Sequence, residues 1–319
     1  MRLLFITATY IGDSVLSSGV LQHVMDRHPE ARVTVAASAI AAPLFEAIPR
    51  LERIHIIAKK RYAGHWFELW RRHAARRWEV VADLRGSAIG YCFLAGRRVM
   101  LGKRDRSRHT VEELSALFGI DPPPALTVWL APRHEAQAET LIPAGASVLA
   151  VGPGANWAGK QWPGERFAAV IRHLTGAKGP LPGARVAVLA AGHERAQTEP
   201  ALAALPPERT IDLVGKVDLP TAAACLKRSA LFVGNDSGLM HLAAAAGTPT
   251  LGLFGPSPEW RYRPWSPRAD YVRTRESFDE LFAQLNAGQR TPETLMDGLA
   301  VETVIGAAEG LLARVGGGA

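Results

Sequence analysis

The sequence predicts an α/β protein built from two doubly wound domains. Short apolar runs alternate with helical patterns through the first half of the chain, a proline-rich stretch interrupts them, and the same alternation restarts in the second half. Such alternation favours parallel sheets that helices cover on both faces. At 319 residues the chain is long enough to bury two cores.

The first half opens on an apolar run at residues 3–7, which predicts a strand, and a helical pattern follows at residues 14–27. Arg2 precedes the apolar residues, but Asp13 interrupts the stretch before the core of a signal peptide could form, so a strand is the better interpretation. Further strands are expected at residues 32–37, 54–57 and 80–83.

A domain boundary is expected within residues 122–145, which hold three consecutive prolines, a strand-like pattern at 126–130 and a polar helix at about 133–140. We therefore expect an N-terminal domain of residues 1–140 and a C-terminal domain of residues 141–319. Ligands of open α/β sheets bind at the carboxyl ends of the strands, so the site is expected in a central cleft that both domains face. Strands of the second domain are expected at residues 147–151, 185–190, 210–212, 231–234 and 250–254, with a closing helix at about 292–315 and a flexible tail at 316–319.

The composition, 48% hydrophobic and 21% charged, is that of a globular protein, and no apolar run approaches the roughly 20 residues of a membrane span. The two cysteines, Cys92 and Cys225, lie in different halves, so neither a disulfide framework nor a metal-spaced pair is expected. The histidines show no HExxH spacing. We expect a cytoplasmic protein without a bound metal or a cofactor.

The positive charge of the chain is concentrated in one region. Residues 50–108 hold 16 Lys/Arg against five Asp/Glu, while the whole chain has a net charge of +7. Such a field attracts polyanions, whether nucleic acid, an anionic membrane surface or a phosphorylated glycolipid. A solvated basic face without a partner is the alternative interpretation.

The most informative stretch is residues 231–256, in which an apolar strand ends at Gly234 and Asn235 and a helix of small residues begins near Gly238. The free amides of the helix start and the hydroxyl of Ser237 predict an anion site suited to phosphate. Asp236 repels phosphate, so we expect it to accept hydrogen bonds from sugar hydroxyls. An N-cap without a ligand is the alternative.

Three further polar residues follow predicted strands. Lys160 lies in the Gly/Pro loop after the strand at 147–151, where its charge could neutralise a diphosphate leaving group, although an ordinary exposed loop lysine would look the same. Glu194 follows the next strand, where a carboxylate commonly holds ribose hydroxyls or else starts a helix. Gly12 is expected to let the backbone turn, and Asp13 then begins the first helix. The helix dipole favours the ionised form of Asp13, as a base requires; an N-cap is the alternative.

These residues together resemble a known family. The order G-D-S, G-x-x-W-x-x-K-x-W-P, G-H-E-R, D-L-V-G-K-V-D-L-P, N-D-S-G-L-M-H-L-A-A-A-x-G-T-P and F-G-P is similar to the bacterial heptosyltransferases of glycosyltransferase family nine and spans nearly the whole chain. The acceptor-facing region at about 40–120 shows no such match. The family usually has Thr at the position of Ser237, and the hydroxyl is retained.

The resemblance implies the GT-B architecture of two Rossmann-like domains, the N-terminal one for the acceptor and the C-terminal one for the nucleotide sugar. It implies ADP-heptose as donor and an anionic glycolipid, the inner core of lipopolysaccharide, as acceptor. Asp13 is then the catalytic base, which leads to inversion without a metal, and Lys160 stabilises the departing diphosphate. Glu194 becomes the ribose ligand, and the donor-binding loop is formed by Asp236, Ser237, Gly238, Met240 and His241.

Two alternatives stay open. One is a related glycosyltransferase with another nucleotide sugar or another acceptor, since donor-side motifs do not identify the acceptor. The other is a GT-B protein without catalysis that binds an anionic surface, which would explain the basic region but not Asp13, Lys160 and Asp236 together. A nicotinamide oxidoreductase is disfavoured because no G-x-G-x-x-G follows the first strand.

The stretch at residues 59–78 interleaves cations with Tyr62, Trp66, Phe67, Trp70 and Trp78. Aromatic residues among cations suit a membrane interface, so we expect peripheral attachment to the cytoplasmic face of the inner membrane and no nucleic-acid partner. The competing interpretation is one helix that buries its tryptophans. The cations expected to face the acceptor or the membrane are Lys59, Lys60, Arg61, Arg71 and Arg72.

Overall fold

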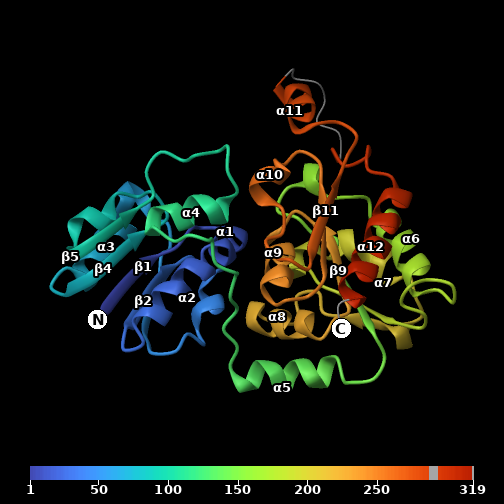
Figure 1. Ribbon diagram of the computed structural model, residues 1–319, viewed down its shortest axis with the longest axis horizontal. Helices are drawn as coiled ribbons and strands as arrows, with labels where there is room; N and C mark the ends of the chain where they lie inside the picture. Colours follow the sequence, from blue (N-terminus) through green and yellow to red (C-terminus); the bar gives the residue numbers. More distant parts are fainter. Residues whose placement is uncertain (287–293, 318–319) are drawn as a thin grey trace. The chain divides into compact units, whose positions relative to one another are not determined.

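The computed structural model describes residues 1–286 and 294–317 and divides into two compact units, Met1–Ala131 and Pro132–Ala319. Each unit contains one parallel sheet with helices on both of its faces (Figure 1). The boundary expected after residue 140 falls inside helix α5 (Pro132–Leu141), which belongs to the second unit because it packs on α8 (Leu219–Lys227).

The first unit contains a five-stranded sheet in the order β3-β2-β1-β4-β5, and all its neighbouring strands are parallel. The central strand is apolar after Arg2 and is buried from Leu3 onwards, because helices cover both of its faces. The four strands expected from the sequence are confirmed, and a fifth was not expected. The strands are β1 (Arg2–Ile6), β2 (Arg32–Ala37), β3 (Leu51–Ile56), β4 (Arg77–Asp83) and β5 (Leu94–Met100).

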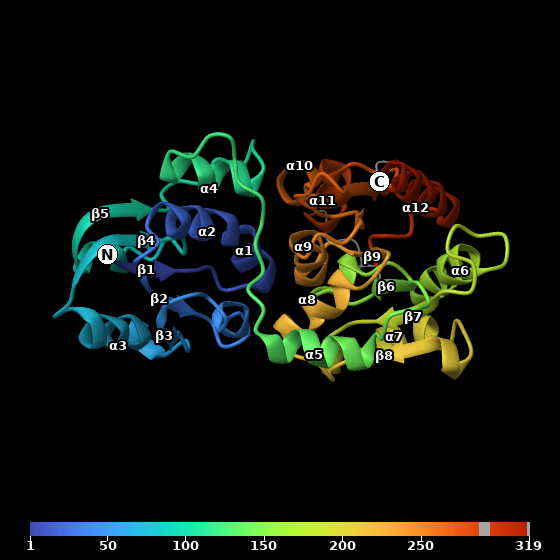
Figure 2. The same ribbon diagram turned by 60° about the horizontal axis from the view of Figure 1, so that its bottom comes forward.

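Helices α2 and α4 lie on one face of this sheet and α3 on the other (Figure 2). The helix expected at residues 14–27 is two helices that meet at Ser17, whose hydroxyl donates to the carbonyl of Ser14 at 2.8 Å. The helices and 3-10 turns are α1 (Ile11–Leu16), α2 (Ser18–Arg27), η1 (Ala42–Phe45), η2 (Arg61–Ala63), α3 (Gly64–His73), η3 (Ile89–Cys92) and α4 (Thr110–Phe118).

The strand expected at residues 126–130 is absent, since this segment runs along α2 without regular structure. The amide of Thr127 donates to Ser18 Oγ at 2.9 Å, and Trp129 Nε1 donates to Gln22 Oε1 at 2.8 Å. Glycine is required at position 19 because a Cβ there would lie 2.4 Å from the carbonyl oxygen of Ala125. The segment therefore satisfies polar groups with helix side chains in place of a neighbouring strand.

The second unit contains a six-stranded parallel sheet in the order β11-β10-β9-β6-β7-β8. All five strands expected here are confirmed, and β11 is additional. The strands are β6 (Val148–Gly152), β7 (Arg185–Val188), β8 (Thr210–Asp212), β9 (Leu231–Asn235), β10 (Thr250–Phe254) and β11 (Ala269–Arg273).

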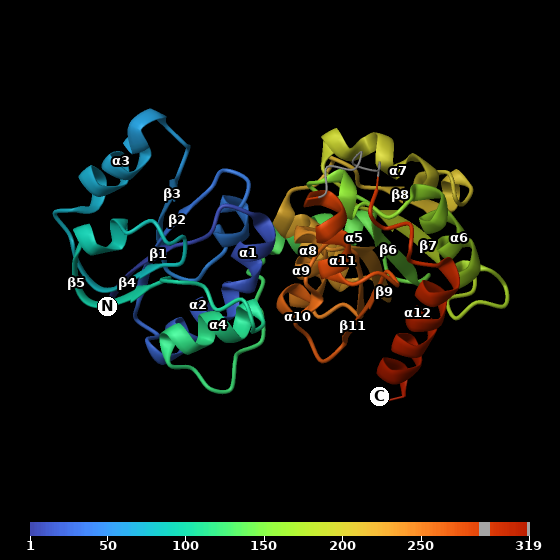
Figure 3. The same ribbon diagram turned by 90° about the horizontal axis from the view of Figure 1, so that it is seen from above.

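The last helix of the second unit, α12 (Val301–Gly316), packs against α6 and the β10–β11 edge of the sheet (Figure 3). It begins later than expected, and the first residues of the predicted helix and the end of the predicted tail lie outside the described residues. The other helices and turns are η4 (Ala158–Lys160), α6 (Gly164–Thr175), η5 (Gly192–Glu194), α7 (Arg195–Leu202), η6 (Pro207–Arg209), α9 (Gly238–Ala245), α10 (Glu259–Tyr262) and α11 (Phe278–Asn286).

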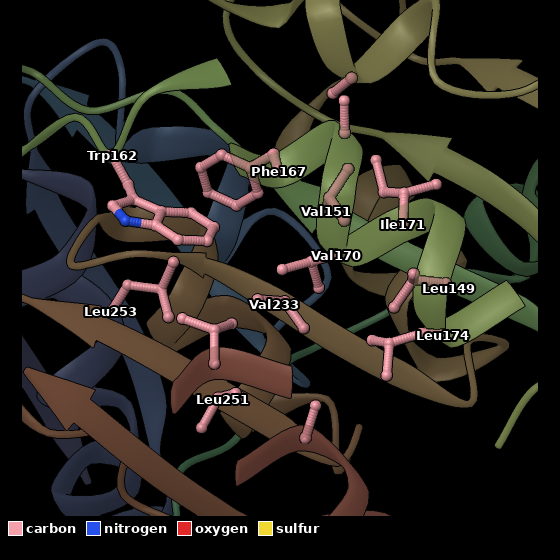
Figure 4. Packing of buried hydrophobic residues seen from close by; sticks show 14 of the residues in the cluster. Leu149, Val151, Trp162, Phe167, Val170, Ile171, Leu174, Val233, Leu251 and Leu253 are labelled. Carbon is pink, nitrogen blue, oxygen red and sulfur yellow. The ribbon is translucent and has the colours of Figure 1, made fainter. Parts of the chain in front are cut away.

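The core of the second unit packs two aromatic rings over the central strands (Figure 4). The rings of Trp162 and Phe167 meet edge to face with their centroids 5.1 Å apart, and aliphatic side chains of β6, β9 and β10 surround them. Each fully buried aliphatic side chain contributes about 1.5–3 kcal/mol. The loops at the carboxyl ends of these strands are therefore anchored to a tightly packed core.

The core of the first unit contains a buried histidine pair. His73 is 1% exposed, and its ring centroid lies 5.4 Å from that of His55 and 5.9 Å from that of Trp78. Among the described residues neither ring nitrogen of His73 has a hydrogen-bond partner. Burial, followed by repulsion from His55 and Arg76, lowers the pKa of His73 to about 4.

We expect this histidine to make folding stability depend on pH. Because its pKa is lower in the folded state than in the unfolded chain, the unfolded chain binds more protons between about pH 6.5 and pH 4, and stability falls as the pH falls through that window. The loss contributed by His73 between pH 7 and pH 5 is about 2 kcal/mol. Urea unfolding at several pH values would measure it. A His73→Phe variant that loses as much stability as the wild type over this range would contradict the expectation.

Candidate functional site

The turn between β9 and α9 presents two polar side chains at a helix N-terminus. Strand β9 ends at Asn235, and the amide of Asp236 still donates to the carbonyl of Leu253 at 3.1 Å. Ser237 is the N-cap of α9, and its Oγ is buried without a hydrogen-bond partner in the part of the chain that the structure describes. The helix dipole and the free amides favour an anion at this point.

The loop after β6 brings a lysine to the same turn. Lys160 Nζ donates to Asp236 Oδ2 at 2.7 Å, and the two side chains are 25% and 7% exposed. His241 Nε2 lies 3.9 Å from the other carboxylate oxygen of Asp236. The structure therefore brings together three residues that the sequence predicted for the donor site, although Lys160 and Asp236 are 76 residues apart in the chain.

Three glycines lie side by side on the neighbouring strands β6, β9 and β10, next to the edge at which β6 and β9 end. Gly152 and Gly252 are both in register with Gly234 on β9. A Cβ at Gly234 would lie 2.5 Å from the ring of Phe232, and one at Gly252 would lie 2.5 Å from the sulfur of Met240. Met240 is fully buried, so the structure places this predicted donor-binding residue in the core beneath the turn.

Glu194 lies at the carboxyl end of β7, next to the same loop. Its Oε2 accepts a hydrogen bond of 2.8 Å from the amide of Ala191, which fixes the side chain on η5. A Cβ at Gly154 would lie 2.6 Å from the Glu194 carboxyl carbon, so the carboxylate packs directly on the backbone of the loop after β6. The second unit thus gathers Glu194, Lys160 and Asp236 at one edge of its sheet.

Asp13 lies in the first unit, in the first turn of α1 and beyond the carboxyl end of β1. The N-cap is Tyr10, so Asp13 is the third residue of the helix, and Gly12 is helical and does not form a turn as expected. Buried hydroxyls lie beneath this helix, with Thr7 Oγ1 3.2 Å from Ser14 Oγ. The carboxylate is partly exposed at the N-terminus of this helix.

Comparison with known proteins decides the family. Residues 85–287 match the sequence model of glycosyltransferase family 9 (heptosyltransferase). The chain belongs to this family. The chain is therefore a glycosyltransferase.

Among curated relatives, lipooligosaccharide heptosyltransferase 2 of Haemophilus influenzae is 25% identical over 86% of this glycosyltransferase and 89% of the relative. Lipopolysaccharide heptosyltransferase 2 of Salmonella typhimurium is also 25% identical, over 86% and 88% of the two chains.

Solved structures confirm the GT-B fold of the glycosyltransferase. The family 9 glycosyltransferase of Veillonella parvula aligns with a TM-score of 0.81 and 22% identity, over 98% of this chain and 97% of that chain. The ADP-heptose lipopolysaccharide heptosyltransferase II of Escherichia coli aligns with a TM-score of 0.74 and 20% identity, over 99% and 100% of the two chains.

The sequence patterns did not single out two residues that hold the loop of Lys160 in place. Asn235 is fully buried and hydrogen-bonded to the loop after β6, and Trp162 donates from Nε1 to the carbonyl of Leu299 at 3.0 Å. Only their positions in the sequence could have indicated these two residues: Asn235 immediately precedes Asp236, and Trp162 follows Lys160 by two residues.

The aromatic residues predicted for a membrane interface divide into two groups. Trp78 lies on β4 and is fully buried, and Trp66 packs against the same core with the Arg85 guanidinium 5.2 Å above its ring. Tyr62 and Phe67 are 96% and 62% exposed. Trp70 is 38% exposed, and its Nε1 donates to the carbonyl of Cys92 on η3 at 3.2 Å. The alternative of one helix that buries its tryptophans is therefore met only in part, because Trp78 is buried on a strand and Trp70 stays partly exposed.

Exposed apolar side chains continue from α3 onto η3 and β5. Tyr91 and Leu94 are 64% and 63% exposed. With Tyr62, Phe67 and Trp70 they form what we call the aromatic–basic surface, whose exposed cations are Lys59, Lys60, Arg61, Arg71 and Arg72. Within it Glu68 pairs with Lys60 and Arg72, at 2.7 Å in each case.

Two other kinds of feature are absent from the part of the chain that the structure describes. Within residues 1–286 and 294–317, no group of three or more His, Cys, Asp or Glu side chains is arranged to hold a metal ion. None of the described helices is long and apolar enough to cross a membrane.

Proposed function

We propose that this glycosyltransferase transfers a heptosyl group from ADP-heptose to the inner core of lipopolysaccharide, with inversion and without a metal. The observation that carries the proposal is the meeting of Lys160 with Asp236 at the N-terminus of α9, next to the buried hydroxyl of Ser237. The substrates follow from the relatives, which are heptosyltransferases of lipooligosaccharide or lipopolysaccharide, and from the E. coli neighbour, which uses ADP-heptose.

In this proposal the donor side stabilises a leaving diphosphate. Lys160, the amides of α9 from Gly238 onwards and the hydroxyl of Ser237 supply positive charge and hydrogen-bond donors to the phosphates. These groups compensate the charge of the departing ADP in the role that a metal ion plays in other enzymes. Glu194, held on η5, is placed to accept hydrogen bonds from ribose hydroxyls.

The remaining polar groups of the turn act on the sugar. Asp236 and His241 approach each other at 3.9 Å, and we assign them to the hydroxyls of the donor heptose. When phosphate binds Lys160, the Asp236 carboxylate loses its cation and becomes free to accept from those hydroxyls. Donor binding thus exchanges one partner of the carboxylate, an ammonium group, for another, the sugar.

Asp13 acts on the acceptor as a general base. The acceptor oxygen forms a bond to the anomeric carbon while the bond from that carbon to the β-phosphate oxygen breaks, and its electron pair leaves with ADP. The proton of the acceptor hydroxyl passes to Asp13. Attack opposite the leaving group inverts the anomeric configuration.

The test of the proposal is transfer from ADP-heptose to a heptose-free lipopolysaccharide core in the presence of EDTA. We expect a product with inverted anomeric configuration by NMR, and an undiminished rate when EDTA is added. Asp13→Asn should bind ADP-heptose like the wild type but turn over about 100-fold more slowly, the usual scale for loss of a general base. Transfer only from another nucleotide sugar, retention of configuration, or an unchanged rate of the Asp13→Asn variant would each refute the corresponding part of the proposal.

Lys160→Ala should weaken the binding of ADP and slow transfer, because the lysine faces charge that grows as the bond to phosphate breaks. Adenosine lacks phosphates and should bind the variant and the wild type alike. Isothermal titration with ADP and adenosine measures both affinities. An equal loss for the two ligands would make Lys160 a structural residue.

We further propose that the aromatic–basic surface attaches the enzyme to an anionic membrane. Its rings are exposed and lie among cations, an arrangement that suits the lipid headgroup region of a membrane. Each basic residue near an anionic surface contributes about 1 kcal/mol to binding. Tyr62 and Ala63 have φ angles of 53° and 57°, so a left-handed turn holds the Tyr62 ring out from the protein. The same cations suit the phosphates of a lipid-anchored acceptor.

Sedimentation with vesicles tests this attachment. We expect binding to vesicles that contain anionic lipid, little binding to neutral vesicles, and weaker binding at high salt, because salt screens exposed charges. Phe67→Ser should reduce binding, whereas Phe282→Ser, at a ring that is 50% exposed in the second unit, serves as the matched control. Binding that ignores lipid charge and salt, or equal effects of the two variants, would leave the surface an ordinary solvated face.

A further inference from the structure

Asn235 connects the two loops that carry Lys160 and Asp236. Its Nδ2 donates to the carbonyl of Pro153 at 2.7 Å, and its Oδ1 accepts from the amide of Trp162 at 3.2 Å. The orientation of the carboxamide is fixed, because a carbonyl can only accept and a backbone N–H can only donate. The side chain is fully buried, so both hydrogen bonds form away from water.

These two bonds hold the loop of Lys160 at both of its ends. Pro153 is the first residue after β6, and Trp162 is two residues beyond Lys160. Asn235 itself is the last residue of β9 and is covalently joined to Asp236. One side chain therefore sets the distance between the backbone that supplies the cation and the backbone that supplies the carboxylate.

A second set of bonds holds the loop next to the lysine itself. The amide of Leu295 donates to the carbonyl of Gly159 at 3.0 Å, and the hydroxyl of Thr294 donates to the carbonyl of Gln161 at 2.5 Å. These two carbonyls flank Lys160 directly. The peptide units around the lysine are thus fixed, and Asn235 supplies the contact on the side of the sheet.

We propose that Asn235 is a positioning residue for donor binding, which acts by holding Lys160 at the phosphate-binding turn. The inference rests on the proposed function, in which Lys160 binds the donor diphosphate. Without the carboxamide, the carbonyl of Pro153 and the amide of Trp162 lose buried partners, and the loop shifts to satisfy them. A shift of the backbone moves the ammonium group away from the site of the phosphates, and a small displacement of a charged group costs binding and rate.

A double-mutant cycle on ADP affinity tests the inference. We expect Asn235→Ala to weaken ADP binding about 10-fold, the scale of one charge-assisted contact, and to leave adenosine binding unchanged. In the Lys160→Ala background the same substitution should change ADP affinity by less than about 2-fold, because Asn235 acts through the lysine. Losses that multiply in the double variant, or an equal loss for adenosine, would overturn the inference.

Two controls keep the test interpretable. Thr248→Val removes a buried hydrogen bond of 2.8 Å to Leu226 at the opposite end of the same sheet, and it should lower stability without weakening ADP binding. If Asn235→Ala fails to fold, Asn235→Ser takes its place, since it adds no charge and its single short hydroxyl cannot replace both hydrogen bonds of the carboxamide. Unchanged ADP binding by Lys160→Ala would refute the phosphate role of the lysine, whereas multiplying losses alone would refute only the role of Asn235.

Discussion

The parallel pairing of β6 with β9 determines where the charged groups of the second unit lie. Both strands are buried along their whole length, and Gly152 stands opposite Gly234 where they end. Parallel neighbours end at the same edge, so the loop with Lys160 and the turn with Asp236 leave the sheet together. The absence of side chains at the two glycines makes room for the ring of Phe232, and the two backbones continue into their loops over a filled core.

The Lys160–Asp236 pair is weak evidence for stability and better evidence for function. Removing two charges from water is costly, and the attraction between them offsets that cost only in good geometry. Here Asp236 is nearly buried while the lysine keeps contact with solvent. A pair of this kind keeps a cation oriented at a helix N-terminus, where an incoming dianion can replace the carboxylate at little reorganisation cost.

Much of both sheets could be predicted from the sequence because buried parallel strands form continuous apolar runs, as in β1 and β9. The edge strands β5 and β11 were missed because they lack such an apolar run. Strand β5 contains Gly96, Arg97 and Arg98 and is mostly exposed, and no residue of β11 is fully buried. The opposite error occurred at residues 126–130, whose strand-like pattern reflects packing along α2, with Leu126 and Trp129 buried.

The candidate site could be predicted where a residue type itself suggests chemistry, as for Lys160 and Asp236. Asn235 could not, because an asparagine at a strand end is typical of any turn, and its partners Pro153 and Trp162 are far away in sequence. The turn predicted at Gly12 was wrong for a related reason. A glycine after a strand suggests a turn, but Gly12 lies within α1. The role of such residues depends on tertiary contacts that no local pattern contains.

The bonds from Thr294 and Leu295 to the lysine loop also concern the synthesis of the enzyme. Thr294 follows its partner Gln161 by 133 residues, so the ribosome completes β6 and its loop long before the segment that fixes them. Domains generally fold as they emerge, N-terminal part first. A nascent chain with most of this sheet already assembled can hold the lysine loop through Asn235 alone, and the two bonds next to the lysine form only late in translation.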